Sequence, residues 1–354
     1  MTPTTEAELS EAIASAKGPL RIVGGDTRQI GHPVAGDTLH TSGLSGITLY
    51  EPGALTLVAQ AGTPLAEIET TLATEGQRLP FEPGDMRGLY GATGQSTIGG
   101  VVATNASGPR RIQAGACRDS VIGVRFVDGQ GQILKNGGRV MKNVTGYDLV
   151  KLMTGSYGTL GVLTEISFKV LPAPEASKTV IIEGQSDEEA VASMSEALGS
   201  PFDVNGAAHI AGKTVIRVEG LEGSVNYRAT ELVKKLGGMV TEFDWTAVRD
   251  LTNFAGREGD IWRFSVKPSD GPKLGAKLRD TGAEVAYDWG GGLVWALSNG
   301  EDLRQHMGDI AGHATLIRGT GYPAFHPEST GIKLLNEGLR MKFDPRNILN
   351  TGRM

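Results

Sequence analysis

The chain has 354 residues, of which 51 are glycine, and its 34 basic and 40 acidic side chains give a formal net charge of −6. This length predicts two domains, each with a full hydrophobic core. The acidic, evenly mixed charge argues against nucleic-acid binding, and no run approaches the roughly 20 apolar residues of a membrane-spanning helix.

The first residues and the single cysteine bear on the cellular setting. Residues 1–18 are acidic and lack the apolar segment of a signal peptide. We therefore expect a cytoplasmic protein, with any contact at the inner face of the plasma membrane peripheral or made through a partner. Cys117 is the only cysteine, so the chain alone holds neither a disulfide nor an all-cysteine iron–sulfur cluster. Electrons would need a carrier on another subunit or a diffusible acceptor.

Capping residues, apolar runs and glycine turns divide the first half of the chain into helices and strands. The predicted elements are, in chain order, a helix after a capping box at Thr5, a strand over 20–23, a strand over 55–61, a helix ending at Glu75 with Thr63 as N-cap, a hairpin over 121–134, a helix over 145–153, and a strand over 160–171 with Thr164, Ser167 and Lys169 facing outward.

Pro172-Ala173-Pro174 interrupts the pattern and marks a domain boundary. Beyond it, strands and helices alternate at close intervals, as in a smaller α+β domain. The predicted elements there are a strand over 179–182, a helix over 187–198, strands over 204–210 and 214–219, a helix over 227–236, a comparable set between 262 and 318, and a last helix over 331–342. We therefore predict domains at 1–172 and 173–328, and a C-terminal helix and tail at 329–354 that returns to the first domain.

Three glycine-rich segments lie in the N-terminal domain, at Gly24-Gly25, at 83–105 and at 155–161. Glycine and small residues are expected where backbone approaches a large ligand, because a Cβ would collide with it. Gly84 belongs to the second segment, and Gly108 lies just beyond it. Three such segments in one domain indicate an extended ligand, and a dinucleotide is the natural candidate.

The first segment reads Gly-Gly-Asp-Thr-Arg after a strand. Freed backbone N–H groups, with Thr27 and Arg28, would serve as donors to a pyrophosphate. Asp26 would repel it unless the carboxylate points away. The segment is not a dinucleotide-binding G-x-G-x-x-G turn between a strand and a helix. In the second segment, small polar residues and backbone donors suit a flat ring and its ribityl chain.

These segments resemble the FAD-binding domain of the vanillyl-alcohol oxidase (PCMH) superfamily. The whole chain, with its ending Phe-Asp-Pro-Arg-Asn-Ile-Leu-Asn at 343–350, is similar to the family of FAD-binding E subunits of bacterial glycolate oxidase. The resemblance implies an α+β fold in which a PCMH-type FAD-binding domain carries a smaller α+β cap domain.

The resemblance also implies which residues hold FAD. The pyrophosphate would be bound at 24–28, the ribityl chain and ring between 97 and 108, the adenine side at 161–162, and the ring again from the returning tail. Together with the glycine that opens the second segment, the expected FAD residues are Gly24, Gly25, Asp26, Thr27, Arg28, Gly84, Thr97, Gly99, Gly100, Ala103, Asn105, Gly108, Gly161, Val162 and Asn350.

Covalent attachment is not expected. No histidine occupies the pyrophosphate turn, since His32 lies beyond it, and Cys117 has no linkage motif. We therefore expect noncovalent FAD.

Two further histidine-containing segments need interpretation. His306 and His313 resemble part of a metal segment of related D-2-hydroxy-acid dehydrogenases, but the following Glu-His pair is missing, and two ligands do not complete a site; we expect no metal. The family similarity instead makes His313 a candidate base and Arg318 a candidate carboxylate ligand. The alternative is an ordinary histidine and a surface arginine. Residues 207–214 fit a relaxed phosphate-loop pattern, which we reject because a strand, not a helix, follows.

The resemblance implies a flavoprotein subunit of a multisubunit glycolate dehydrogenase. Hydride would leave the glycolate α-carbon for the flavin, giving glyoxylate, and electrons would pass to an iron–sulfur subunit. The family complex also contains a second flavoprotein subunit. Two alternatives remain open: a non-catalytic structural or electron-relay subunit that carries FAD, and a stand-alone FAD oxidoreductase for another small substrate.

Overall fold

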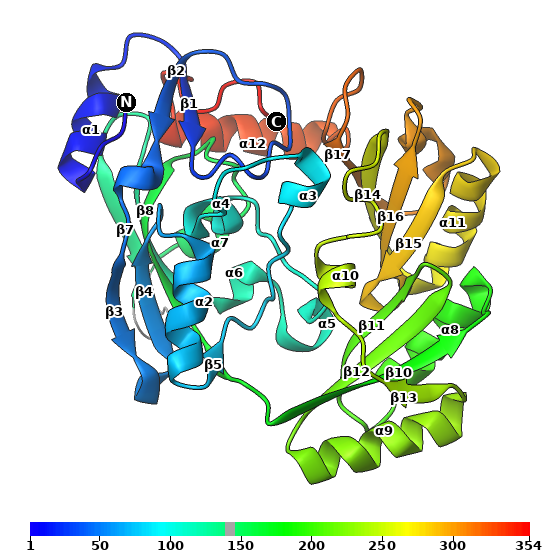
Figure 1. Cartoon of the computed structure of the whole chain (residues 1–354). Helices are drawn as coiled ribbons and strands as arrows, with labels where there is room; N and C mark the ends of the chain where they lie inside the picture. The colour runs from blue at the N-terminus through cyan, green and yellow to red at the C-terminus, as the bar shows by residue number, and fades with distance from the viewer. Residues whose placement is uncertain (139–145) are drawn as a thin grey trace.

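The computed structural model describes residues 1–138 and 146–354 (Figure 1). The first 172 residues build a five-stranded sheet in the order β3-β4-β8-β6-β7 and contribute both strands of each of two small sheets. The strands are β1 (Leu20–Val23), β2 (Asp37–His40), β3 (Ile47–Glu51), β4 (Thr56–Gln60), β5 (Gln77–Arg78), β6 (Val121–Val127), β7 (Ile133–Gly137), β8 (Val162–Lys169) and β9 (Leu171–Pro172). The α-helices are α1 (Glu6–Ser15), α2 (Leu65–Thr74), α3 (Arg87–Tyr90), α4 (Ile98–Ala103), α5 (Arg111–Ala114), α6 (Cys117–Ser120) and α7 (Leu149–Met153).

Two expectations for this half are wrong in detail. Pro64, not Thr63, is the N-cap of α2; the Thr63 hydroxyl donates instead to Gln60 O at 2.7 Å. Thr164 and Ser167 are buried rather than facing outward. Thr164 lies under α1, where its hydroxyl donates to Glu6 Oε1 at 2.6 Å. Of the helix predicted over 145–153, only 149–153 is helical, as α7; 146–148 is not helical, and residue 145 lies outside the described residues.

The second half contains an antiparallel eight-stranded sheet in the order β13-β10-β12-β11-β15-β16-β14-β17. Its strands are β10 (Ala176–Glu183), β11 (Val204–Ile210), β12 (Lys213–Gly220), β13 (Met239–Thr241), β14 (Asp260–Val266), β15 (Glu284–Asp288), β16 (Leu293–Ser298) and β17 (Gly312–Arg318). Its helices are α8 (Asp187–Leu198), α9 (Glu222–Leu236), α10 (Thr246–Arg249), α11 (Gly271–Asp280) and α12 (Thr330–Phe343), with 3-10 turns η4 (Trp289–Gly291) and η5 (Leu303–Met307). The rejected phosphate-loop pattern at 207–214 is the tight hairpin between β11 and β12.

The two faces of the large sheet have different roles, because successive side chains of a strand point to opposite faces. Trp262 and Phe264 belong to the core cluster that includes buried residues of α8, α9 and α11. The opposite face carries Ile261 and Trp295, which share a second cluster with Leu89 of the first half. The sheet therefore packs this second face against the first half of the chain.

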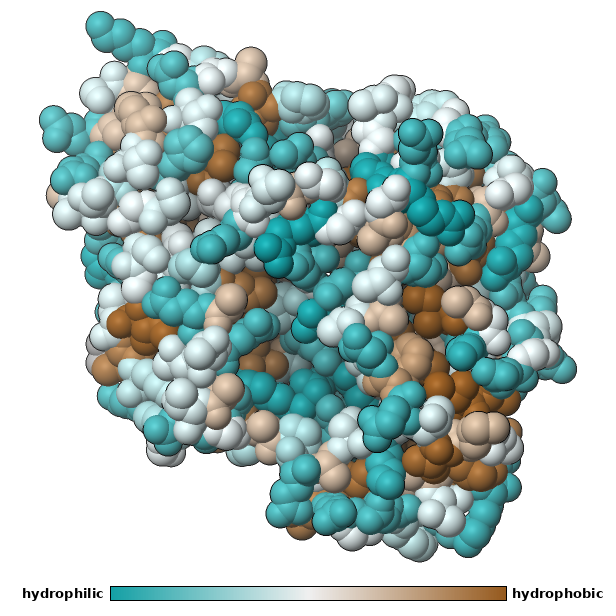
Figure 2. Space-filling model, viewed as in Figure 1, coloured by the Kyte–Doolittle hydropathy of each residue, from teal (hydrophilic) through white to brown (hydrophobic). Residues whose placement is uncertain are grey.

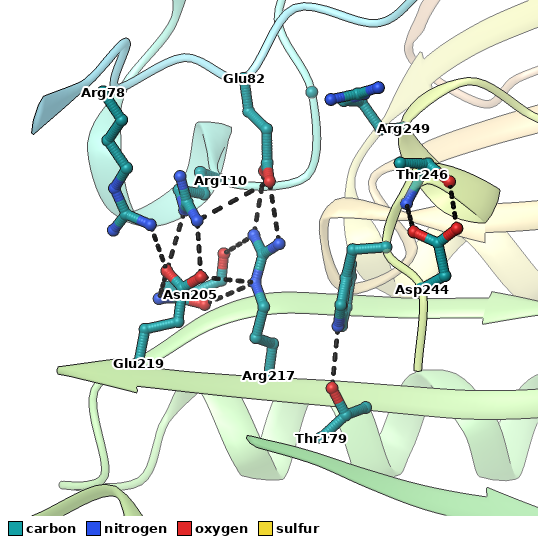
Figure 3. A network of polar contacts seen from close by, with 12 residues as sticks. Arg78, Glu82, Arg110, Thr179, Asn205, Arg217, Glu219, Asp244, Thr246 and Arg249 are labelled. Carbon is teal, nitrogen blue, oxygen red and sulfur yellow. Dashed lines mark hydrogen bonds and ion pairs between the residues drawn. The ribbon is translucent and has the colours of Figure 1, made fainter. Parts of the chain in front are cut away.

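A buried cluster of ion pairs also joins the two halves (Figure 3). Arg217 on β12 makes a two-pronged contact with Glu82 of the first half, both N–O distances being 2.9 Å. Conversely, a carboxylate of the second half meets arginines of the first half: Glu219 accepts hydrogen bonds from Arg110 at 2.6 and 3.0 Å and from Arg78 at 3.0 Å. The side chains of Arg217 and Glu219 are only 3% and 6% exposed. Burial alone would raise the pKa of Glu219, but Arg217 and Arg110 outweigh it and the pKa lies below its ordinary value.

The C-terminal tail contacts the first half again. Leu349 pairs with Leu20 of β1 in a parallel bridge, and the Asn350 side chain accepts from Ile22 N and donates to Tyr157 O, both at 2.8 Å. The preceding helix α12 has no fully buried residue. In the described residues, no helix has the length and apolar character needed to cross a membrane.

Candidate functional site

A cavity of about 780 Å3, open mouth included, lies where the glycine-rich segments of the first half meet the C-terminal tail. Most residues predicted from the sequence to bind FAD line it. These are Gly24, Gly25, Asp26, Thr27, Arg28, Thr97, Gly99, Gly100, Ala103, Gly161, Val162 and Asn350.

The turn after β1 and the segment before α4 touch through their backbones. A Cβ on Gly25 would lie 1.5 Å from Gln95 O, and a Cβ on Gly94 would lie 2.0 Å from Gly25 O. Only glycine allows this approach. Gly100 differs, because a Cβ there would meet only the Thr97 hydroxyl, at 3.4 Å. The glycines therefore have two functions: some join the walls of the cavity, and Gly100 leaves space within it.

Asp26 adopts a left-handed backbone conformation, with φ of 53°, which favours glycine at this position. Its carboxylate pairs with Arg21 at 2.8 Å. The negative charge that sequence reasoning found awkward beside a pyrophosphate is thus compensated by an arginine five residues earlier.

Two arginines that form no ion pair within the described residues bring positive charge to the cavity wall. Arg28 donates to Ser96 Oγ at 2.6 Å and to Gly84 O, and Arg353 donates to Ile30 O at 2.9 Å. The buried Nε atoms of both have no partner among the described residues. Burial lowers the pKa of Arg28, and the charge of Asp85 only partly opposes it. Unsatisfied buried donors are costly, so an anionic ligand such as a dinucleotide pyrophosphate fits this wall.

Gly84, Asn105 and Gly108 do not line the cavity. A Cβ on Gly84 would lie 2.4 Å from Arg249 O, and one on Gly108 would lie 2.1 Å from Glu82 O. The Asn105 side chain accepts from Arg118 N at 3.1 Å. The two glycines therefore allow close backbone packing, and Asn105 fixes a loop.

The predicted catalytic residues lie apart from the cavity. Arg318 donates from its three nitrogens to the carbonyls of Leu89, Arg257 and Gly259 at 2.5–3.1 Å. This arrangement gives Arg318 a structural function, and a substrate carboxylate would have to displace those contacts. His313 is exposed on β17. Partial desolvation lowers its pKa, as do the neighbouring charges of Arg263 and His326.

The remaining histidines and the cysteine show no metal site. His306 Nε2 contacts Glu301 at 2.9 Å, and within residues 1–138 and 146–354 no three His, Cys, Asp or Glu side chains gather as metal ligands. Cys117 is fully buried, and burial raises the pKa of its thiol. Neither Cys117 nor His32 lines the cavity.

Sequence reasoning missed several residues near the site. Tyr157 and Arg353 line the cavity, and each lies within a few residues of a predicted position, so a wider window around these positions would have included them. Arg111, Arg263 and Trp289 meet from three separate elements. No local motif marks them, and only the fold brings them together.

Comparisons with known proteins place an FAD-binding domain in the half of the chain that supplies most of the cavity wall. The family model described as FAD binding domain matches residues 1–137. The chain is 41% identical to glycolate oxidase subunit GlcE of Escherichia coli over 353 residues, which is 98% of this chain and 95% of that protein. It is 34% identical to glycolate oxidase subunit GlcD of Bacillus subtilis over 146 residues, covering 41% of this chain and 30% of that protein.

A solved structure of alkyldihydroxyacetonephosphate synthase is similar over the whole of this chain and 77% of its own, with a TM-score of 0.74 and 16% sequence identity. At this identity the likeness concerns the fold alone. Together these comparisons confirm the predicted α+β class, with a PCMH-type FAD-binding domain and a smaller α+β cap domain.

Proposed function

Because the chain belongs to the family of glycolate oxidase subunit GlcE, we propose that it is the FAD-binding subunit of a multisubunit enzyme that oxidises glycolate to glyoxylate. The observation that carries the proposal is the similarity over nearly the full length of both chains. The anion-compatible cavity, lined by most of the residues predicted for FAD, supports it.

In this proposal FAD is held noncovalently, by the turn at 24–28, by α4 and by Asn350, which line the same cavity. Bound FAD supplies a two-electron acceptor. The donors of Arg28 and Arg353 orient the anionic part of the cofactor. His313, whose lowered pKa keeps it neutral at pH 7, accepts the proton of the substrate hydroxyl. Electrons leave through an iron–sulfur subunit, since one cysteine cannot hold a cluster.

A second candidate function is an FAD-bearing structural or relay subunit, with hydride transfer on the companion flavoprotein. The observation that favours it is that Arg318 is engaged by three backbone carbonyls, so the carboxylate ligand predicted from the sequence is committed elsewhere. The cytoplasmic location predicted from the sequence applies equally to both candidates.

The two candidates are separated by the visible spectrum of the purified full chain, recorded anaerobically before and after glycolate is added. Loss of the flavin absorption is the expected result for a dehydrogenase subunit. An unchanged flavin spectrum assigns the chain to the relay role. A third outcome is that the purified chain contains no flavin. If the chain purified together with the companion subunit then carries no more FAD than the companion alone, the cofactor assignment is wrong.

The partner in this proposal is the companion flavoprotein, and helix α12 is its docking surface. Leu334, Leu335 and Met341 are 63%, 66% and 73% exposed, and every residue from 327 to 338 is exposed. An isolated helix of this length is marginal in water, so a partner that covers these side chains would stabilise it. The surface of the companion flavoprotein that covers α12 is therefore apolar.

Changing Leu334 and Leu335 together to serine is expected to weaken co-purification with the companion flavoprotein by roughly 100-fold or more, because two buried leucines contribute about 1.5–3 kcal/mol each. Thermal stability of the isolated chain should not fall, since both side chains are exposed there. The matched control changes Leu221, just before α9, and Tyr227, on α9, which are 67% and 62% exposed. If both pairs of substitutions weaken co-purification equally, or if neither pair weakens it, α12 is not the docking surface.

A further inference from the structure

Trp289 lies against two arginine side chains that come from different halves of the protein. The Cζ atom of Arg111 on α5 is 4.5 Å from the centroid of the Trp289 ring, and that of Arg263 on β14 is 5.3 Å from it. The indole N–H donates to Gly108 O at 3.0 Å, which fixes the ring between the halves. Two guanidinium groups are thus held at one indole ring. Burial lowers the pKa of Arg263, and the charge of Arg111 lowers it further because like charges repel.

Among the described residues, neither arginine has a carboxylate within ion-pair distance or a side-chain hydrogen bond; Asp119, which pairs with Lys151, favours the charged form of Arg111 without pairing with it. The other two arginine–tryptophan contacts found in the described residues differ. Arg217, over Trp245, pairs with Glu82, and Arg304, over Trp262, pairs with Asp302. Partly buried positive charge without a counter-ion is unfavourable, so the pair at Trp289 is suited to an anion from outside the chain.

The pair lies next to the FAD cavity. Arg263 is opposite Thr315 in the β14–β17 ladder, and Ser265 is opposite His313, so Arg263 and His313 lie on the same face of the sheet. That face packs against Tyr157, which lines the cavity. Burial raises the pKa of Tyr157, and the positive charge of Arg263 opposes the rise. The charge of Arg263 also acts on His313, so an anion at Arg263 would lie near both Tyr157 of the cavity wall and the candidate base.

We propose that Arg111 and Arg263, held by Trp289, bind the carboxylate of a small organic acid at the junction of the two halves. The identity of the acid as a 2-hydroxy acid rests on the proposed function; the anion site itself rests on the two unpaired guanidinium groups. A planar carboxylate matches the fork of a guanidinium group and can accept from both arginines. The site takes over the function that sequence reasoning gave to Arg318.

The test measures binding of oxalate, a dicarboxylate with no oxidisable hydroxyl, to the full FAD-loaded protein by calorimetry. Arg263→Met and Arg111→Met are each expected to weaken oxalate binding by about 10- to 100-fold, the effect of losing a hydrogen bond to a charged group. The matched control is Arg257→Met, whose side chain is 47% exposed and pairs with Glu284; it should change the affinity less than twofold.

Thermal unfolding separates binding from a structural role. Removing an unpaired, partly buried charge should leave the midpoint unchanged or raise it, whereas a structural arginine would lower it. Unchanged oxalate affinity in both variants overturns the site, as does tighter binding of inorganic phosphate than of oxalate. Oxalate binding does not require turnover, so the two proposals can fail separately. If the protein binds oxalate through Arg263 but glycolate leaves its flavin oxidised, the anion site stands and the proposed catalytic function is wrong.

Discussion

Replacing Arg217 with methionine is expected to lower the free energy of unfolding by about 3 to 5 kcal/mol, the usual effect of breaking a buried ion pair from one side. Glu82 would lose its two-pronged contact, and Glu219 would lose a neighbouring positive charge at 3.9 Å. Both carboxylates are buried or nearly so, with exposures of 15% and 6%. Figure 3 shows both carboxylates directed into the group of arginines between the two halves. Urea denaturation, monitored by tryptophan fluorescence, measures the loss.

The control for this variant is Arg257→Met, which removes the same charge from an ion pair with both partners more than 40% exposed. Such surface pairs contribute about 0–1 kcal/mol. If Arg217→Met and Arg257→Met cost the same, the cluster does not hold the halves together. A double-mutant cycle with Glu82→Gln should show a coupling of roughly 0.5–3 kcal/mol, because the two side chains are in direct contact.

Replacing Gly25 with alanine is expected to weaken FAD binding by about 100-fold, which corresponds to roughly 3 kcal/mol of overpacking strain. The new Cβ would overlap Gln95 O, a backbone atom that moves only if the neighbouring cavity wall moves with it. Fluorescence titration of the apoprotein with FAD measures the affinity, and circular dichroism confirms that the fold is retained.

Two further glycines make this test specific. Gly18→Ala adds a methyl group with nothing within 4 Å, so both FAD affinity and stability should stay within error of the parent. Gly100→Ala adds a methyl group to the cavity without a protein clash, so it should weaken FAD binding while leaving the stability of the apoprotein unchanged. Full FAD affinity in both Gly25→Ala and Gly100→Ala would show that FAD binds elsewhere.

The sequence predicted the part of the cavity lining that is encoded locally. Runs of glycine and small residues are readable without a structure because the requirement for space acts on neighbouring positions. The second half was also readable at the level of elements, with α8 and β11 found at their observed ends, because capping residues and alternation are local signals.

What the sequence did not reveal depends on residues distant in sequence. Thr164 has the alternation of an outward-facing residue, yet α1 covers it, and Glu6 on that helix accepts a hydrogen bond from its hydroxyl. Arg318 has the chemistry of a carboxylate ligand, but three carbonyls from α3 and the 257–259 loop surround it in the fold. Arg263 gave no signal, since an arginine within a strand becomes interesting only when its neighbours lack a carboxylate.

The surface between the two halves is hollowed and mainly hydrophilic in the space-filling view (Figure 2), in keeping with the charged residues that meet there. This polar junction explains why hydrophobic periodicity alone did not reveal how the halves pack. The apolar contacts that do cross it, such as Leu89 with the sheet face, come from short segments without a clear period.

The closure of the cavity by Asn350 and Arg353 has a consequence for biosynthesis. Asn350 contacts Ile22, 328 residues earlier in the chain, and a ribosome adding about 5–20 residues per second needs roughly 15 to 65 s to make the intervening segment. Throughout that time the nascent first half lacks one wall of its cavity. If FAD binds in this cavity as proposed, we expect cofactor loading to follow translation of the tail, and a nascent chain stalled before position 350 to emerge without tightly held flavin.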